Sequence, residues 1–251
     1  MEARNDATSG LQRSTYPSTC YQRLVGRYEI VGRFIAIEGG DGSGKATQSK
    51  LLASYLREQG SDVLEADFPR YGEASAYYVE RYLNGAYGGP NDVPAELGAL
   101  PFALDRFAAK EAIIKHLQKP NAIVISNRYV ASNLAHHGTK VSDPAERKAF
   151  YERIMLTEYG VFGIPRPDQN IVLVVPADLA QANVDKKEAR SYTELKRDIH
   201  EADANHLELA KANYEELCTL YPDEFTAIDC TENGQMRAID DIQSEIRTLV
   251  A

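Results

Sequence analysis

Short apolar runs alternate along this chain with longer segments whose apolar residues recur every three to four positions. The short runs predict strands, because strands buried on both faces are continuously apolar, and the longer segments predict helices with one buried face. The expected strands are 33–37, 62–66, 122–126, 169–175 and 225–229. The expected helices lie near 45–59, 74–84, 94–118, 129–137, 143–158, 193–219 and 236–249. This alternation predicts an α/β fold in which helices cover both faces of a parallel sheet.

Pro101 conflicts with one continuous helix over 94–118. Proline lacks a backbone N–H and its ring clashes with the preceding turn. The sequence therefore predicts a kink at Pro101 or a new helix that begins there.

The first 32 residues lack this alternation and are rich in Ser, Thr and Arg. Transit peptides share that composition, but Glu2 and Asp6 interrupt it and no amphipathic face is evident. We expect residues 1–32 to be a disordered N-terminal extension, or to stem from a start codon placed too early. Residues 33–251 then form the folded domain.

The motif Gly-Gly-Asp-Gly-Ser-Gly-Lys at 39–45 follows the first expected strand and leads into a helix. It matches the phosphate-binding pattern of Gly, four residues, then Gly-Lys. Its glycines let backbone N–H groups turn inward around an anion, and Lys45 reaches the β- and γ-phosphates. A glycine-rich turn that ends in Lys by chance would not explain both flanks. The residues expected to bind ATP are Gly39, Gly40, Asp41, Gly42, Ser43, Gly44, Lys45, Ala46 and Thr47.

The position after Lys45 departs from this pattern. A Ser or Thr hydroxyl normally ligates Mg²⁺ there, whereas this chain has Ala46, with Thr47 one step further on. Alanine cannot coordinate a metal. Either water fills the position, or the metal is held from elsewhere, or catalysis is impaired.

Composition narrows the function classes. The 251 residues suffice for one substantial core, and 28 basic against 37 acidic residues give a net charge of −9. Such a charge argues against a nucleic-acid partner or an anionic membrane surface, and no apolar run approaches a membrane-spanning length. The three cysteines are far apart in sequence, as expected of reduced thiols in a cytoplasmic enzyme.

Three arginines, each beside an aromatic residue, lie near the ends of expected strands or between them. They are Arg70 in segment 67–72, Arg106 in segment 102–107 and Arg128 in segment 127–133. Ligands collect at the carboxyl ends of parallel strands, so we expect the three to converge beside the phosphate loop. Guanidinium groups bind phosphate through paired N–H donors, and aromatic rings suit a base. Any single arginine could instead form a surface salt bridge, but three together favour a nucleotide site.

These motifs together resemble the thymidylate kinase family of nucleoside monophosphate kinases. The resemblance runs from about residue 33 to the C-terminus and rests on segments 38–45, 68–70, 102–106, 128–129 and 132–133 and on a lid region near 184–201. It implies a three-layer sandwich, a five-stranded parallel sheet flanked by helices, with a lid segment. It also implies a homodimer, for which the first long helices are the expected contact.

For the phosphates and the sugar, the resemblance implies one role per matched residue. Arg70 would hold the acceptor phosphate for in-line attack, and Arg128 would also contact phosphate. Asp41, inside the loop, would bind the sugar 3′-hydroxyl. His136 stands where the family usually has an aromatic residue near the sugar 2′ position. The residues alone leave open that His136 is a surface helix residue.

For the acceptor base, the resemblance points to four positions. Phe102 would stack on thymine, Arg106 would contact the base or the acceptor phosphate, and Asn133 would line the base pocket. Phe68, in the Phe-Pro-Arg motif, belongs to the same expected dTMP site. The residues alone leave open that Phe102 is ordinary core.

A second departure concerns the metal. The family usually reads Asp-Arg-Tyr where this chain has Asn127-Arg128-Tyr129, and that Asp helps to hold Mg²⁺, mostly through water. Asn127 offers a neutral oxygen without the charge. We expect Mg²⁺ as the cofactor that accompanies ATP, with Asn127 as its water-mediated contact.

Phosphoryl transfer needs positive charge near the transferred group, and some family members place an arginine inside the phosphate loop, where this chain has Gly42. The missing charge is therefore expected from the lid. Lys186, Lys187 and Arg190 are the candidates, of which we assign Arg190 to catalysis. The alternative is that the three solvate an exposed turn.

The expected function is ATP-dependent phosphorylation of dTMP to dTDP. A kinase for another pyrimidine monophosphate, dUMP or dCMP, is the alternative with the same fold. A nucleotide-binding protein that no longer catalyses is the alternative from a different class, suggested by Ala46 and Asn127.

Overall fold

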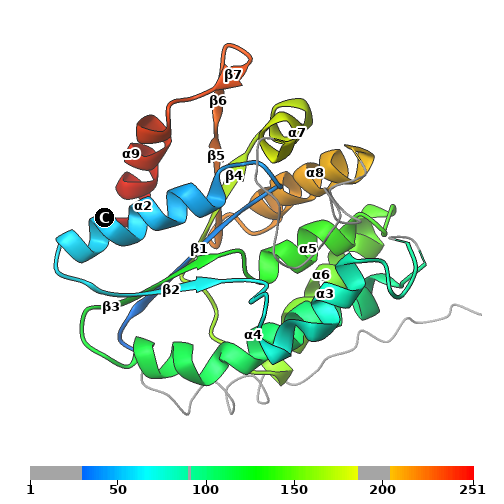
Figure 1. Cartoon of the computed structure of the whole chain (residues 1–251), viewed down its shortest axis with the longest axis horizontal. Helices are drawn as coiled ribbons and strands as arrows, with labels where there is room; N and C mark the ends of the chain where they lie inside the picture. The colour runs from blue at the N-terminus through cyan, green and yellow to red at the C-terminus, as the bar shows by residue number, and fades with distance from the viewer. Residues whose placement is uncertain (1–29, 90–91, 186–203) are drawn as a thin grey trace, which may run out of the picture.

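Five parallel strands form the sheet of this protein, whose computed structural model describes residues 30–89, 92–185 and 204–251. In spatial order β2-β3-β1-β4-β5, they are Asp62–Asp67, Ala122–Asn127, Arg33–Gly39, Gln169–Val174 and Phe225–Asp229 (Figure 1). Each expected strand is present with ends within two residues of the prediction, and the expected parallel sheet is confirmed. Because β1 lies at the centre, the loop that follows it opens at the middle of the carboxyl edge.

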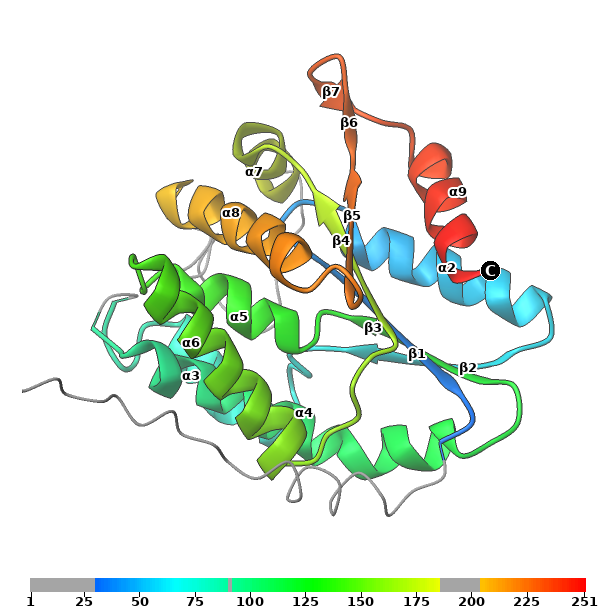
Figure 2. The same cartoon turned by 180° about the vertical axis from the view of Figure 1, so that it is seen from behind.

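Alternate residues of each strand enter different helical layers, as the two-residue period of a strand requires. Phe34 and Ala36 of β1 belong to the core cluster under α4, α5, α6 and α8, while Ile35 and Ile37 pack with α2 and α9. Figures 1 and 2 show these helices on opposite faces of the sheet. The three-layer architecture expected from the sequence is confirmed.

The principal helices match the predicted ones closely. They are α2 (Lys45–Glu58), α4 (Ala95–Leu117), α5 (Val130–Gly138), α6 (Pro144–Met155), α8 (Ala204–Leu220) and α9 (Ile239–Val250). The part of the predicted helix 193–219 that precedes residue 204 lies outside the described residues. Segment 74–84 divides into η1 (Ala74–Ala76) and α3 (Tyr77–Leu83). No new helix begins at Pro101, which lies inside α4.

Helix α7 (Ala177–Asp185), which follows β4, and a hairpin near the C-terminus were not predicted. The predicted helix 143–158 ends instead in a π-helical turn, η2 (Leu156–Val161), which continues α6. A small hairpin joins β6 (Thr231–Glu232) to β7 (Gln235–Met236) through Asn233 and Gly234, both at positive φ. Asn-Gly is a strong hairpin signal, so this turn was readable from the sequence.

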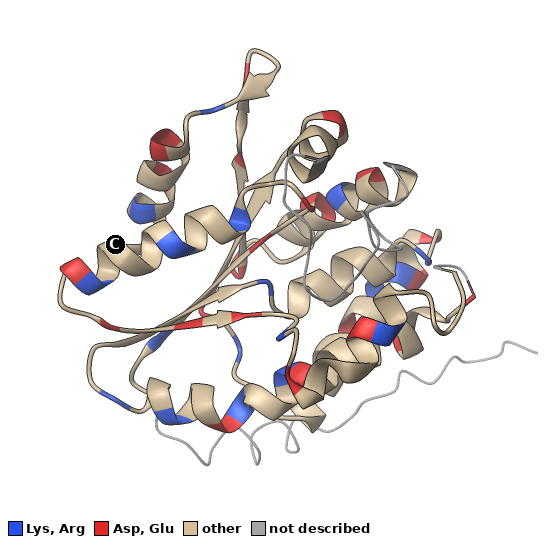
Figure 3. Cartoon of the chain, viewed as in Figure 1, with Lys and Arg blue, Asp and Glu red and all other residues tan. Residues whose placement is uncertain are grey.

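Charges of both signs are interspersed over helices α2, α4 and α8 (Figure 3). Among the described helices, none combines the length and the apolar character needed to cross a bilayer.

Candidate functional site

The phosphate loop lies between β1 and α2, as predicted. Gly44 forms the N-cap of α2 at φ 90°, in the left-handed region that favours glycine. Gly42 has φ 80°, and a Cβ at this position would overlap the carbonyl oxygen of Ala180 in α7. Asn183 of α7 donates to the Gly42 carbonyl at 3.0 Å. Helix α7 therefore rests directly on the loop, at the position where an arginine of the loop would project.

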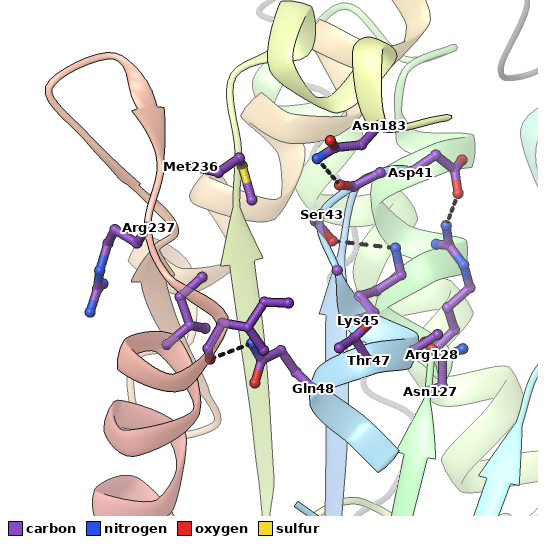
Figure 4. Close-up of a pocket in the computed structure, with 15 residues that line it drawn as sticks. Asp41, Ser43, Lys45, Thr47, Gln48, Asn127, Arg128, Asn183, Met236 and Arg237 are labelled. Carbon is purple, nitrogen blue, oxygen red and sulfur yellow. Dashed lines mark hydrogen bonds and ion pairs between the residues drawn. The ribbon is translucent and has the colours of Figure 1, made fainter. Parts of the chain in front are cut away.

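Lys45 folds over the loop, and Figure 4 shows its ammonium facing the loop residues. Its Nζ donates to the Gly40 carbonyl at 2.6 Å and lies 3.5 Å from the Ser43 hydroxyl oxygen. The side chain is buried, so the charge acts in a site with little bulk water. This places a cation where phosphate oxygens of a bound nucleotide would meet the loop.

Arg128 brings a second cation to the loop from the end of β3. Its φ of 66° lies in the left-handed region that few residues other than glycine adopt. Its side chain forms an ion pair with Asp41 and donates to Ser132 Oγ at 3.0 Å. Burial is the largest single effect and lowers the pKa of Arg128, but Asp41, together with Tyr214, Glu38 and Tyr71, outweighs it, so the net pKa is raised. The guanidinium is therefore charged at every working pH.

Hydrogen bonds to Glu38 hold the backbone around Arg128 in its left-handed conformation. The carboxylate is fully buried and accepts hydrogen bonds from the Tyr129 backbone N–H at 2.6 Å and the Ser132 hydroxyl at 2.8 Å. The Tyr214 hydroxyl adds a third hydrogen bond at 3.1 Å. The last side chain before the loop thus connects β1 to α5 and α8, and keeps Arg128 facing Asp41.

Arg70 follows the end of β2, and hydrogen bonds hold its side chain in place. Its Nε donates to Asp105 Oδ1 at 3.0 Å, and its Nη2 donates to Ser75 Oγ at 2.6 Å and to the Asp105 carbonyl at 3.1 Å. Asp105 is buried, whereas the Arg70 side chain is 28% exposed. Within the described ranges Nη1 has no partner, which leaves one donor edge of the fork for a ligand phosphate.

Arg106 does not share this environment, contrary to the expectation that all three arginines meet beside the loop. Its side chain is 2% exposed and forms a two-pronged ion pair with Glu158, at 2.6 and 2.7 Å. A third donor, Nη1, reaches the Tyr129 carbonyl at 3.2 Å. Asn133 donates to the same Glu158 at 2.9 Å. Glu158, at the end of the predicted helix 143–158 and inside η2, therefore organises two of the residues that the resemblance places around the base.

The aromatic residues of the expected acceptor site lie in two places. Phe68 is buried in the main core with its ring 5.8 Å from that of Tyr129. Phe102 is half-buried, with edge contacts to Tyr82 at 6.0 Å and His137 at 5.4 Å between ring centres. The rings of Tyr82 and His137 thus hold the Phe102 ring in place. Whether it stacks on a base stays a prediction.

His136 is buried, so the alternative of a surface helix residue is wrong. Its Nε2 lies 3.2 Å from Arg128 Nη1, and its Nδ1 lies 3.2 Å from Nε2 of His206 in α8. Arg128 has only donors to offer, so Nε2 must be the acceptor and Nδ1 carries the proton. His136 therefore supports Arg128 through Nη1, whereas Asp41 binds Nη2.

A pocket of about 450 Å³ extends from the loop to the start of α9. The loop and Arg128 line one end (Figure 4). Sequence reasoning missed the other end, which Met236, Arg237, Ile239 and Ile242 line. An anionic chain bound at the loop would extend toward the apolar side chains at this end, which suit a flat ring. The Asn-Gly turn at 233–234 was the signal that could have indicated a hairpin here.

Asn127 and Ala46 both line this pocket. The Asn127 amide nitrogen donates to Asp67 at 2.8 Å. Its oxygen is buried and has no hydrogen-bond partner in the part of the chain that the structure describes. An oxygen without a partner at this position fits a hydrated hard cation such as Mg²⁺.

The expected lid residues Lys186, Lys187 and Arg190 lie outside the described residues. So do Asp198, His200, Glu201 and Asp203, which follow them in sequence. Residues 184 and 185 of the expected lid form the last turn of α7.

Comparison with known proteins gives a consistent result. The family model for thymidylate kinase matches residues 37–233. Thymidylate kinase from Mycobacterium tuberculosis is 36% identical over 188 residues, which cover 73% of this chain and 84% of the relative. A probable thymidylate kinase from Pyrococcus abyssi is 34% identical over 185 residues, 72% and 83% of the two chains. The solved thymidylate kinase of Candida albicans superposes with a TM-score of 0.65 at 20% identity, over 87% of this chain and 91% of that one, which supports the fold.

Proposed function

Because the chain belongs to the thymidylate kinase family, we propose that the site around Lys45, Arg70 and Arg128 transfers the γ-phosphoryl group of ATP to dTMP. The protein is a nucleoside monophosphate kinase that forms dTDP. The observation that carries the assignment of residues is the meeting of three elements at one sheet edge: the loop with Lys45, the braced Arg70 and the Asp41–Arg128 pair.

At the ATP phosphates, the protein contributes positive charge and positioning more than covalent chemistry. The loop N–H groups and the Lys45 ammonium hold the β- and γ-phosphates, so the charge that spreads over the transferred group is already opposed by cations. The 450 Å³ pocket leads from these phosphates toward Met236 and Ile239, which cover the nucleoside end of ATP.

Arg70 and Arg128 orient the phosphate of the acceptor, dTMP. The free edge of Arg70 grips the dTMP phosphate, while Arg128 stands between the two phosphates and is held by Asp41, Ser132 and His136. The acceptor oxygen is already anionic, so no general base is required. The chain contributes orientation, which accounts for a large part of the rate in phosphoryl transfer.

We propose Mg²⁺ as the cofactor, and the described residues fit it. Oxygen ligands and retained water suit this cation, and the unpartnered Asn127 oxygen beside Ala46 provides such a place. When bound with ATP, the metal would neutralise phosphate charge, and the Asn127 oxygen would hold it through water.

The thymine pocket is proposed above Phe102, with Arg106 and Asn133 beneath it. Both of these are buried and joined to Glu158, so they shape the floor rather than reach into the loop. The 5-methyl group of thymine alone supports about 10–200-fold discrimination, so dUMP is expected to be a poor secondary substrate.

We also propose that two copies of the chain associate through α4. Four apolar side chains at helical spacing, Leu97, Leu100, Leu104 and Phe107, are 39–59% exposed on its outer face. A contiguous exposed apolar face marks an interaction surface, and a helix face can pair with its own copy around a two-fold axis. A cytoplasmic location stays a prediction from the separated cysteines.

The acceptor assignment is tested by steady-state rates with ATP and a panel of dTMP, dUMP and dCMP. The proposal expects the highest kcat/KM for dTMP. A higher kcat/KM for dCMP or dUMP would move the protein to another pyrimidine monophosphate.

A further inference from the structure

The phosphate loop is bordered on its β2 side by a second, smaller hollow of about 70 Å³. Ala46 and Asn127 line both this hollow and the larger ATP pocket, so the two spaces adjoin. A single water needs about 10–15 Å³, so the hollow accommodates several. It borders position 46, where the hydroxyl is missing, and position 127, where an amide replaces the carboxylate.

The polar atoms of this hollow lack partners. Ser49 is 5% exposed and its hydroxyl has no hydrogen bond within the described ranges, although it lines the hollow. The buried oxygen of Asn127 is in the same state. Unpartnered buried oxygens are costly, and two that line one hollow indicate that water or an ion belongs there.

A carboxylate stands beside them. Asp67, the last residue of β2, is in register with Asn127, the last residue of β3, and accepts its amide N–H at 2.8 Å. Within the part of the chain that the structure describes, Asp67 forms no ion pair within 4.0 Å.

The charges near Asp67 also favour a metal site there. The charges of Arg128, Lys45 and Lys50 act on the Asp67 carboxylate, so the cations of the phosphate site lie near it. A carboxylate that is exposed to solvent, lacks an ion pair and lies near phosphate-binding cations is suited to receive a hydrated metal bound to those phosphates.

We propose that Asp67 supplies the carboxylate of the Mg²⁺ site, on β2 instead of β3, and that it acts through water held in the hollow beside Ala46, Ser49 and Asn127. This inference rests on the proposed function, because the metal arrives with ATP. It accounts for both departures at once: the charge absent from position 127 lies on the adjacent strand, and water takes the place of the hydroxyl absent from position 46.

The test measures metal binding without turnover. The protein–ADP complex is titrated with Mn²⁺, and free Mn²⁺ is followed by electron paramagnetic resonance. Asp67→Asn keeps an acceptor for Asn127 and is expected to weaken Mn²⁺ binding about 10–100-fold, the usual effect of losing an outer-sphere partner of a metal site. The matched control is Glu65→Gln, because Glu65 lines the same hollow from β2 but pairs with Arg57, and it is expected to stay within twofold of wild type.

A carboxylate swap separates a metal role from a folding defect. Asp67→Asn combined with Asn127→Asp returns the charge to β3 and is expected to restore Mn²⁺ affinity to within about threefold of wild type. ADP affinity in EDTA and the thermal midpoint are recorded for each variant to establish a folded nucleotide site. The inference is overturned if Asp67→Asn binds Mn²⁺ as tightly as wild type, or if Glu65→Gln loses as much affinity.

The proposed function is judged separately by wild-type turnover of dTMP in the same preparations. Turnover with an unaffected Asp67→Asn titration would overturn the inference alone. Absence of wild-type turnover, with a normal Mn²⁺ titration, would overturn the function alone.

Discussion

Some residues of this site have an environment set by their neighbours in sequence, and others have one set by distant residues. The sequence predicts the first kind better than the second. Lys45 is local: its position after the glycines and before α2 determines where its ammonium points. Arg106 is not local, because its environment depends on Glu158, 52 residues later in the chain. The motif predicted the first environment and missed the second, since nothing near Arg106 in sequence indicates a buried carboxylate partner.

The partly exposed Arg70 and half-buried Phe102 serve opposite ends of the acceptor nucleotide in this account. Phe102→Ala is expected to raise the KM for dTMP about 5–150-fold, because stacking of one base is worth about 1–3 kcal/mol. The KM for ATP is expected to change little, since Phe102 does not line the donor pocket. Arg70→Ala is expected to lower kcat more than Phe102→Ala does, because a loosened phosphate loses its in-line aim.

Steady-state kinetics with each substrate varied in turn check these expectations. Equal losses of affinity for ATP and dTMP in Phe102→Ala would show that Phe102 is core and that the acceptor pocket lies elsewhere.

At the scale of elements, the strands were predicted almost completely because a buried parallel strand is an unbroken apolar run, as in 171–174. Helix α7 was missed because nine residues are too few to establish a helical period. Its place on Gly42 depends on backbone contact with Ala180, which side-chain patterns do not encode.

The contact between α7 and the loop is tested by two glycine substitutions. Gly42→Ala and Gly44→Ala share the cost of a positive φ, about 1–2 kcal/mol. At Gly44 an added Cβ meets nothing within 4 Å, whereas at Gly42 it overlaps the Ala180 carbonyl. Urea unfolding of the nucleotide-free protein is expected to show a larger loss of stability for Gly42→Ala. Equal losses for the two variants would mean that α7 does not rest on the loop.

An ion pair between α6 and α8 predicts that the stability of the protein depends on pH. Arg147 donates to both carboxylate oxygens of Glu216, at 2.7 and 2.9 Å, and Tyr151 donates to one of them. These hydrogen bonds, that of Arg147 foremost, lower the pKa of Glu216 below 4.5. A depressed carboxyl pKa contributes stability that is complete above the unfolded pKa and is lost as pH falls through the folded one.

Glu216→Gln is therefore expected to lower the free energy of unfolding by about 1 kcal/mol at pH 7, and the deficit is expected to shrink below about pH 4.5. Denaturant melts of both proteins from pH 3 to 8 measure this. The exposed Glu152→Gln on α6 is the control and should run parallel to wild type. A deficit for Glu216→Gln that is constant with pH would argue against the ion pair as its cause.

For the whole molecule, the order of the strands places the loop at the centre of the sheet and lets α4 present its outer face to a second copy. Helical periodicity predicted α4, but the apolar residues on its outer face were not separable from core by sequence alone. Leu104 and Ala103 look alike in a hydrophobic pattern, yet one is 42% exposed and the other 3%.

Leu104→Glu is expected to convert a dimer to a monomer, because it buries a charge in the proposed interface. Sedimentation velocity at micromolar concentration measures this. The matched control is Leu209→Glu on α8, which has a similar exposure of 41% and lies away from α4. A wild-type monomer, or a dimer that survives Leu104→Glu, would contradict association through this face.

The central claim is that the loop, Arg70 and Arg128 form a working phosphoryl-transfer site for dTMP. The most direct measurement compares dTDP formation from ATP and dTMP by wild type and by Lys45→Ala, with Mg²⁺ present and with circular dichroism to confirm the fold. The exposed Lys115→Ala on α4 is the control. The account predicts turnover by wild type and by Lys115→Ala, and loss of turnover in a folded Lys45→Ala. Near-normal dTDP formation by Lys45→Ala, or none by wild type, would contradict it.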